Sequence, residues 1–444
     1  MKYQTYPAYK DSGVEWLGDI PTDWQVLPLK LVTANKVKDG PHETPKFLDE
    51  GVPFFSVDSI QGNQLIFEGC RYISKEDHKI FSQKCLPKKG DVLLGKAASV
   101  GKVAYVDTNK EFNVWSPLAV ITPKSEALGK FIFYSLQSPW LQAQCDVLSN
   151  SNTQKNLSMQ VIDNLSFAFP INSVAKQIAQ FLDHETAKID TLIEKQQRLI
   201  ELLKEKRQAV ISHAVTKGLN PNAPMKDSGV EWLGEVPEGW EVTKAKFLFE
   251  FITSGSRGWA EYYSDDGALF FRITNLTRDT IEPKLESIQN VTIPSSGEGE
   301  RAKINKNDLL ISITADLGSV CVANDDVAGG YVSQHVSLCR PNKNVASSRW
   351  LGFYILSDIA KEQFLGSGYG GTKIQLSLED IRELLIVKPV EKEQIKIADY
   401  IDSKNLKFAS LIESANSAIE LMQERRTALI SAAVTGKIDV REWN

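Results

Sequence analysis

The sequence predicts a mixed α/β (α+β) fold that occurs twice, as two β-rich globular modules separated by two long helices. The first observation is a repeat, because residues 11–18 recur unchanged as residues 227–234, 216 positions later in a chain of 444 residues. The second is the segment 173–217, which has no glycine or proline and has aliphatic residues at helical spacing. A repeat of half the chain is too long for a solenoid unit and indicates duplication of a whole module.

Matching strands are predicted in the two halves. Short apolar and β-branched runs bounded by Gly, Asn and Asp are typical of strands. Three such runs in the first half have counterparts in the second: 51–55 with 267–271, 90–94 with 307–311, and 101–104 with 318–321. Each module is therefore expected to be a mixed, β-rich domain of about 150 residues.

A helix is predicted after these strands in each half. Apolar residues recur every four positions, at Ile132, Leu136 and Trp140 and again at Leu351, Ile355 and Ile359. Polar loops follow, at 149–155 and 366–373, and each leads into a serine that is a predicted helix N-cap, Ser158 or Ser377. Asp380, three residues after Ser377, predicts a capping box. Each half then closes with a strand that ends in proline, Pro170 or Pro389.

Each long helix carries mostly apolar positions that step alternately by three and four residues, which is the pattern of a coiled-coil seam. The predicted seam positions are Ile189, Leu192, Gln196, Leu199, Leu203, Lys206 and Val210, and 219 positions later Phe408, Leu411, Ala415, Ala418, Met422, Arg425 and Leu429. At about 1.5 Å per residue, each helix would be roughly 60–70 Å long. We expect the helices to pack on each other as an antiparallel coiled coil; the alternative is that each covers its own module.

The predicted boundaries are 1–170 for the first module, 171–220 for the first long helix, 221–389 for the second module and 390–444 for the second long helix. The chain has no apolar run of about 18 residues, and its start lacks the apolar core of a secretion signal. Its five cysteines are scattered, which is typical of reduced thiols and favours a cytoplasmic location. The net charge of −5 means that any contact with nucleic acid must use a local basic surface.

Enzyme motifs are incomplete in this sequence. Residues 90–97 resemble a phosphate-binding loop, but Ala97 stands where Ser or Thr should hold magnesium. Glu282 and Lys284 have the spacing of some nucleases, but a turn is the simpler interpretation. The five histidines lack metal-ligand spacing. We therefore expect a binding protein with no catalytic residues, no metal site and no cofactor of its own.

The opening 6–18, continuing to Pro21 and Trp24, resembles the DNA-specificity subunits of type I restriction–modification systems. The ends of both halves, 170–212 and 389–431, are similar to the same family. The resemblance covers the whole chain and is weakest inside the globular modules.

The resemblance implies that each module is a target-recognition domain for one half of a bipartite double-stranded DNA site. It implies that the helices set the gap between the half-sites and dock two methyltransferase subunits, which carry S-adenosylmethionine. Restriction/translocase subunits that use ATP and magnesium would join this complex. The complex, rather than this chain, would then be an adenine-specific methyltransferase and endonuclease. Alternatives are a duplicated-module protein-interaction scaffold that does not bind DNA, and a specificity subunit of a methylation-only system.

Contacts to DNA require polar and basic side chains on exposed loops. The candidate DNA-binding residues in the first module are Lys96, Ser99, Lys102, Asn152, Thr153, Gln154 and Lys155, and in the second Ser256, Arg257, Thr314, Gln334, Tyr369, Gly370, Thr372 and Lys373. The repeated tryptophans are expected to pack in the core or between module and helix: Trp16, Trp24, Trp232 and Trp240.

Overall fold

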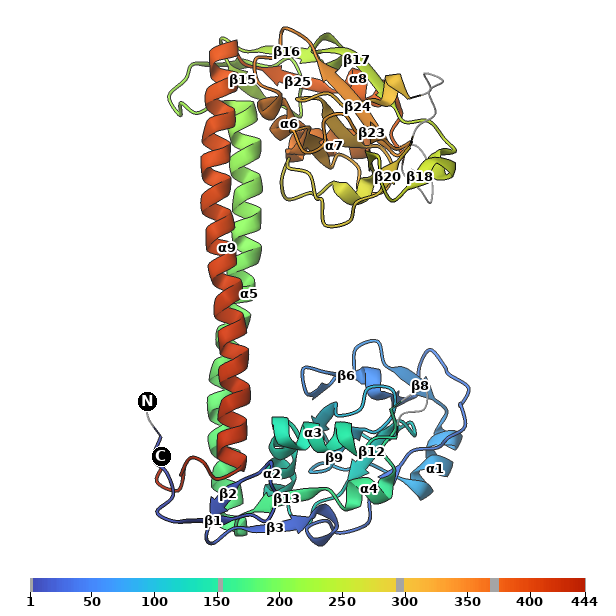
Figure 1. The fold of residues 1–444 in the computed structure, drawn as a ribbon, viewed down its shortest axis with the longest axis vertical. Helices are drawn as coiled ribbons and strands as arrows, with labels where there is room; N and C mark the ends of the chain where they lie inside the picture. Colours follow the sequence, from blue (N-terminus) through green and yellow to red (C-terminus); the bar gives the residue numbers. More distant parts are fainter. Residues whose placement is uncertain (1–2, 151–154, 293–298, 368–374, 444) are drawn as a thin grey trace. The chain divides into compact units, whose positions relative to one another are not determined.

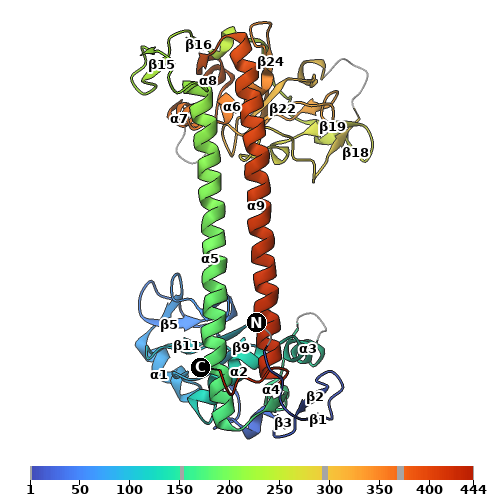
Figure 2. The same ribbon diagram turned by 90° about the vertical axis from the view of Figure 1, so that its left-hand side faces the viewer.

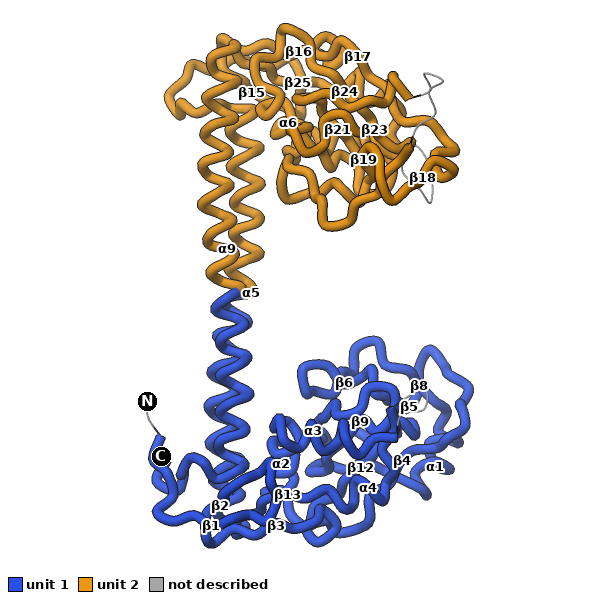
Figure 3. The backbone as a smooth tube through the Cα atoms, in the orientation of Figure 1, with its two compact units in different colours: residues 1–196, 417–444 blue, residues 197–416 orange. Residues whose placement is uncertain are grey.

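The computed structural model of the chain describes residues 3–150, 155–292, 299–367 and 375–443. It divides into two compact units, Met1–Gln196 with Ser417–Asn444, and Gln197–Asn416 (Figure 3). The predicted boundaries follow the ends of the long helices, whereas the compact units cut through both helices. In the described part of the chain, no helix is long and apolar enough to cross a membrane.

Unit 1 is built on a four-stranded antiparallel sheet, in the order β10 (Val103–Tyr105), β9 (Val92–Gly95), β12 (Leu118–Ile121) and β4 (Lys38–Asp39). The segment that resembled a phosphate-binding loop is the buried central strand β9. A second sheet has the order β11 (Asn113–Val114), β5 (Val52–Phe55) and β8 (Arg71–Ile73). Shorter elements complete the unit: β1 (Tyr9–Asp11), β2 (Asp19–Pro21), β3 (Gln25–Pro28), β6 (Ile60–Gln61), β7 (Gln64–Leu65), β13 (Ser166–Phe169), α1 (Lys75–Lys84) and α4 (Met159–Asp163).

Unit 2 repeats this plan. Its antiparallel sheet has the order β17 (Phe249–Ser254), β24 (Val336–Pro341), β21 (Leu309–Ser312) and β22 (Val320–Val322). Its second sheet has the order β18 (Tyr263–Ser264), β20 (Asn290–Val291), β19 (Ala268–Phe271) and β23 (Tyr331–Val332). The remaining strands and short helix are β14 (Met225–Asp227), β15 (Glu235–Pro237), β16 (Glu241–Lys244), β25 (Leu385–Lys388) and α8 (Leu378–Glu383). The capping box at the start of α8 is confirmed, since Ser377 Oγ accepts from Asp380 N at 3.1 Å and Ser377 N donates to Asp380 Oδ2 at 2.7 Å.

The single helix predicted after the strands is two helices in each unit, so this prediction was wrong. Ile132 and Leu136 lie in α2 (Glu126–Leu136), but Trp140 lies in α3 (Pro139–Val147). The corresponding pair in unit 2 is α6 (Ser348–Leu356) and α7 (Asp358–Ser367). In unit 1 the break comes at Ser138, which is extended and followed by Pro139 in the first turn of α3, and proline cannot continue the preceding helix.

The long helices are α5 (Asn172–Lys217) and α9 (Glu391–Val434). In unit 1 they lie side by side and run antiparallel, because Asp190 of α5 pairs with Arg426 of α9, whereas Phe181, earlier in α5, packs on Trp443, beyond the end of α9 (Figures 1 and 2). In unit 2, Ile211 of α5 and Ile397 of α9 share one core. The antiparallel pairing that we expected is therefore confirmed in unit 1.

Part of the observed seam lies one residue later in the chain than predicted. Five predicted positions are exposed: Leu192, Leu199, Lys206, Leu411 and Arg425. In each case the next residue in the chain is at least partly buried: Ile193, Ile200, Arg207, Ile412 and Arg426. Leu192 is 50% exposed and Leu411 is 52% exposed. Three of these pairs place leucine directly before isoleucine, so apolar character alone could not decide which residue faces the partner helix.

Equivalent ion pairs fasten each module to a long helix. In unit 1, Lys130 of α2 pairs with Asp183 of α5, and Tyr134 donates to the same carboxylate at 2.8 Å. In unit 2, Arg349 of α6 makes two hydrogen bonds to Asp402 of α9, at 2.7 and 2.6 Å. Lys130 and Arg349 are 219 positions apart, and so are Asp183 and Asp402. The two sets of predicted seam positions have the same spacing.

We expected the second long helix to reach residue 444, but α9 ends at Val434. The residues after it return to the globular part of unit 1. Asp439 N donates to Gln4 O at 2.8 Å, and Tyr9 donates through its hydroxyl to Gly436 O at 3.0 Å. Arg441 pairs with Asp439 and lies over the ring of Tyr6. The two ends of the described chain are therefore held together.

Candidate nucleic-acid interface

Each unit contains one pair of parallel strands, β5 with β11 and β19 with β23, and every other strand pair in the described residues is antiparallel. The chain leaves both strands of a parallel pair at the same edge. There, Trp115 N donates to Phe55 O at 2.8 Å in unit 1, and Ser333 N donates to Phe271 O at 2.9 Å in unit 2. The two units therefore have the same backbone arrangement at this edge.

A glycine packs against this edge in each unit. A Cβ atom added to Gly40 would lie 1.6 Å from Val114 O, and one added to Gly255 would lie 2.0 Å from Val332 O. Only glycine allows such a close approach of backbone to backbone. The edge is thus fixed by backbone contacts, and its side chains are free to differ between the units.

In unit 2 this edge opens into three adjoining cavities, with volumes of about 550, 260 and 620 Å³. The first two share Ser256, Gly258 and Trp259, and the last two share Ile273 and His335. We call this continuous depression the recognition groove. Trp259 forms part of its apolar lining, stacked on Phe270 with ring centres 5.4 Å apart.

Basic side chains line the recognition groove over much of its length: Arg257, Arg272, Arg278, Arg301, His335 and Lys361. Glu261 and Asp316 are acidic residues in the lining, and Asp316 is paired with Arg278. The excess of basic groups is local, in a chain whose net charge is −5. It provides the local basic surface that contact with phosphates requires.

Three buried polar atoms at the strand edge have no hydrogen-bond partner among the described residues. They are Arg272 Nε, Ser333 Oγ and Gln334 Oε1, and all three residues line the middle cavity. Buried polar atoms without partners are rare in folded proteins, because each loses its hydrogen bonds to water. The groove therefore has donor and acceptor groups available to a ligand.

The predicted DNA-binding residues of unit 2 converge on this groove as far as the structure describes them. Ser256, Arg257, Thr314 and Gln334 all line it. The other predicted residues of this unit lie outside the described residues: Tyr369, Gly370, Thr372 and Lys373.

In unit 1 the predicted residues occupy the turn after β9 and the segment beside it. Lys155 is exposed and pairs with Asp146, while Ser99 and Lys102 are partly buried. Lys96 is buried, with its Nζ atom 3.3 Å from the buried carboxylate of Asp39, so its ammonium group already has a partner inside the unit. Asn152, Thr153 and Gln154 lie outside the described residues.

Arg272, Ser333 and His335 were not among the candidates from the sequence. Arg272 directly follows Phe270 and Phe271, which match Phe54 and Phe55 of the first half. The sequence signal was that the two halves match at the Phe-Phe pair and differ at the next residue, which is Ser56 in the first half and Arg272 in the second. Such a difference beside a match indicates a side chain that varies on a shared backbone. The contribution of Ser333 could not be predicted, because it depends on the parallel pairing of β19 and β23.

Nucleophilic chemistry by two buried thiols of unit 1, Cys85 and Cys145, is disfavoured. Burial raises the pKa of Cys85 to about 11 and that of Cys145 to about 12. Both thiols are therefore protonated at neutral pH, and the thiolate is the nucleophilic form.

A second surface is formed by the repeated octapeptide. In both copies the loop is closed by the same bonds: Ser12 N donates to Gly18 O at 3.2 Å, and Ser228 N donates to Gly234 O at 3.0 Å. This conformation buries Leu17 and Leu233 but leaves Trp16 66% exposed and Trp232 47% exposed. The prediction of packed tryptophans holds for Trp24 and Trp240, which are buried, and was wrong for Trp16 and Trp232.

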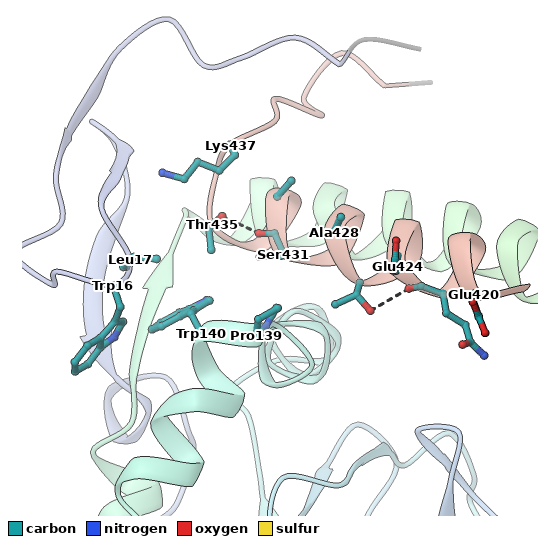
Figure 4. Close-up of a pocket in the computed structure, with 13 residues that line it drawn as sticks. Trp16, Leu17, Pro139, Trp140, Glu420, Glu424, Ala428, Ser431, Thr435 and Lys437 are labelled. Carbon is teal, nitrogen blue, oxygen red and sulfur yellow. Dashed lines mark hydrogen bonds between the residues drawn. The ribbon is translucent and has the colours of Figure 1, made fainter. Parts of the chain in front are cut away.

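Trp16 stands at one end of a groove of about 880 Å³ on unit 1 (Figure 4). Trp140 and Pro139 of α3 form its side, α9 contributes Ala428 and Ser431, and Thr435 follows directly after α9. Glu420 and Glu424 lie at the other end of the groove in Figure 4. The groove is mainly apolar with an acidic end, which suits an apolar segment of a partner protein that carries basic residues.

Comparison with known proteins gives a consistent result. The sequence model of the type I restriction modification DNA specificity domain matches residues 21–203 and again 237–421. A putative type I restriction enzyme MjaX specificity subunit from Methanocaldococcus jannaschii is 23% identical over 438 residues, covering 96% of both chains. The EcoKI specificity subunit of Escherichia coli is 21% identical, covering 96% of this chain and 91% of its own length.

Solved structures support the same fold. A chain from a study of complex assembly and conformational transition in the type I R-M system has a TM-score of 0.69 at 15% identity, covering 94% of this chain and 98% of that chain. The HsdS subunit from Thermoanaerobacter tengcongensis has a TM-score of 0.51 with the same coverage. Because the two domain matches together span most of the sequence, the chain belongs to the family of type I restriction–modification DNA specificity subunits.

Proposed function

We propose that this chain selects a bipartite DNA target, with each unit recognising one half-site and with α5 and α9 setting the gap between them. The observation that carries the proposal is a contrast between constant and variable surfaces. The octapeptide loops are identical in sequence and hydrogen bonding, whereas the strand edges share a backbone frame but differ in side chains. Identical surfaces suit two copies of one partner, and differing surfaces suit two different DNA sequences.

The identical surfaces would each dock one methyltransferase subunit through Trp16 and Trp232. Large exposed aromatic residues are common anchors of protein interfaces. The methyltransferase would supply S-adenosylmethionine, and restriction subunits would supply the sites for ATP and magnesium. This chain would contribute recognition and spacing without catalysis, and the complex would modify adenine and cut unmodified DNA.

Continuity of α5 from one unit into the other supports the spacing role. The helix has 46 residues, which corresponds to about 69 Å at 1.5 Å per residue. The ion pairs Lys130–Asp183 and Arg349–Asp402 fix a module to a long helix within each unit. A recognition module fixed to a continuous helix would define one gap length rather than a range.

Methylation-site sequencing of cells that express the chain with its methyltransferase tests this function. We expect a motif of two half-sites with one fixed gap, which disappears when this chain is omitted. A complex that assembles and methylates DNA without such a motif would instead favour a scaffold that does not select DNA.

A further inference from the structure

The strand edge places different side chains on one backbone frame in the two units. In unit 2, Arg272 follows β19, and Ser333 and Gln334 follow β23. The equivalent positions of unit 1 are Ser56, Trp115 and Ser116, because Trp115 and Ser333 make the same backbone hydrogen bond to the neighbouring strand.

The frame continues into a matching turn. In unit 1, Ser59 N donates to Ser56 O at 3.0 Å, and in unit 2, Asn275 N donates to Arg272 O at 2.9 Å. Asn275 is completely buried and donates from Nδ2 to Lys284 O and Ser287 O, which holds the following loop in place. The side chain at position 272 is therefore presented from a rigid turn, as precise recognition of a ligand requires.

The chemistry of the edge in unit 2 matches the edges of base pairs. A guanidinium group can donate two hydrogen bonds to O6 and N7 of guanine, and a carboxamide can pair with N6 and N7 of adenine. The Nε atom of Arg272 and the Oε1 atom of Gln334 are buried without partners among the described residues. Ser333, only 5% exposed, adds an unpartnered hydroxyl in the same cavity.

The charges around this cavity place it within a path for the DNA backbone. Arg257 and Arg301 line the adjoining cavity on one side, and Lys361 lines the cavity on the other. Phosphate contacts position a protein on the duplex, and base contacts provide its sequence preference. The middle cavity holds Arg272, Ser333 and Gln334, which are buried or partly buried, and exposed basic groups flank it on both sides, which follows that division.

We propose that the strand edge is the base-recognition site of each unit, and that in unit 2 Arg272 recognises a guanine, Gln334 an adenine, and Ser333 supports them. This inference rests on the proposed function and names the residues that carry it out. In unit 1 the same edge, with Ser56, Trp115 and Ser116, would recognise the other half-site by different contacts.

The test is methylation-site sequencing of cells expressing the full chain and its methyltransferase, with Arg272→Ala or Gln334→Ala. Each variant should relax one position of one half-site, with a roughly ten- to hundredfold loss of discrimination there. The other half-site should be unchanged in the same cells, which shows that the variant chain is folded and assembled. Arg382→Ala is the matched control, because Arg382 of α8 is partly exposed, pairs with Glu379 and does not line the groove.

Gln334→Glu separates recognition from structural support. A carboxylate accepts from N4 of cytosine, so the position relaxed by Gln334→Ala should shift its preference towards cytosine. Unchanged half-sites in Arg272→Ala, Gln334→Ala and Gln334→Glu would overturn the inference. An equal loss of discrimination at every position of both half-sites would also overturn it. A wild-type chain that directs no bipartite motif would instead remove the proposed function itself.

Discussion

Arg349 is the residue whose removal most directly tests how a module is fixed to a long helix. Its guanidinium group makes two hydrogen bonds to Asp402 and lies 2.7 Å from Glu282 Oε1. These carboxylates raise the pKa of Arg349 above its ordinary value, so the group is charged at all working pH values. Arg349→Met keeps much of the side-chain volume and leaves the two carboxylates without their shared cation.

The expected cost follows from the geometry. Hydrogen bonds to charged groups contribute about 1.5–3 kcal/mol each when buried, but the Arg349 side chain is 38% exposed and solvent screens it. We therefore expect Arg349→Met to lower the free energy of unfolding of unit 2 by about 2 kcal/mol in total. Arg349→Lys should cost about 0.5 kcal/mol, because unit 1 naturally has Lys130 at the equivalent position.

Urea unfolding followed by tryptophan fluorescence provides the assay, since the buried Trp350 neighbours the substituted residue. The unfolding curve must be fitted with a separate transition for each unit. The reasoning would be refuted by a Met variant as stable as the wild type, or by a Lys variant as unstable as the Met variant.

Three further predictions concern other parts of the chain. Trp16→Ala should leave the fold intact and weaken methyltransferase binding by about 2 kcal/mol in calorimetry, whereas Glu15→Ala in the same loop should not. Insertion of one heptad after Gln196 and one after Ala415 keeps the seam in register and lengthens both helices by about 10 Å, so the sequenced gap should grow by up to about three base pairs; an unchanged gap would contradict the spacing role. Arg441 lowers the pKa of Asp439, so this pair stabilises the fold above the ordinary carboxyl pKa of about 3.9, and the contribution is lost as pH falls through the lowered value. The stability difference between wild type and Asp439→Asn should therefore be largest near neutral pH and vanish in acid; a difference independent of pH would count against it.

The duplicated architecture could be predicted because its determinants are local. The octapeptide, the strand runs and the absence of helix breakers between 173 and 217 all lie within single windows of sequence. The seam register could not be predicted fully, since Leu192 and Ile193 are both apolar and only packing distinguishes them. Pro139 did indicate a helix boundary, but the periodicity of apolar residues across it led to the prediction of one continuous helix.

The candidate site was predictable only in part. Thr314 follows a predicted strand, and polar loop residues are reasonable candidates for contact with DNA. Gln334 follows β23, which was not among the predicted strands. Lys96 has the same character in the sequence, yet it pairs with Asp39, which is 57 positions earlier in the chain. Whether a lysine faces solvent or a buried carboxylate depends on strand order, and short-range patterns carry little information about that order.

The central claim is that the two units are equivalent frames that recognise different half-sites. Replacing residues 221–389 with a second copy of residues 5–170 gives a chain with two identical recognition edges on the same long helices. Methylation-site sequencing of cells that express this chain with the methyltransferase should find the first half-site twice, in inverted order around a fixed gap. If the complex assembles and still methylates the original two-part motif, the claim is contradicted.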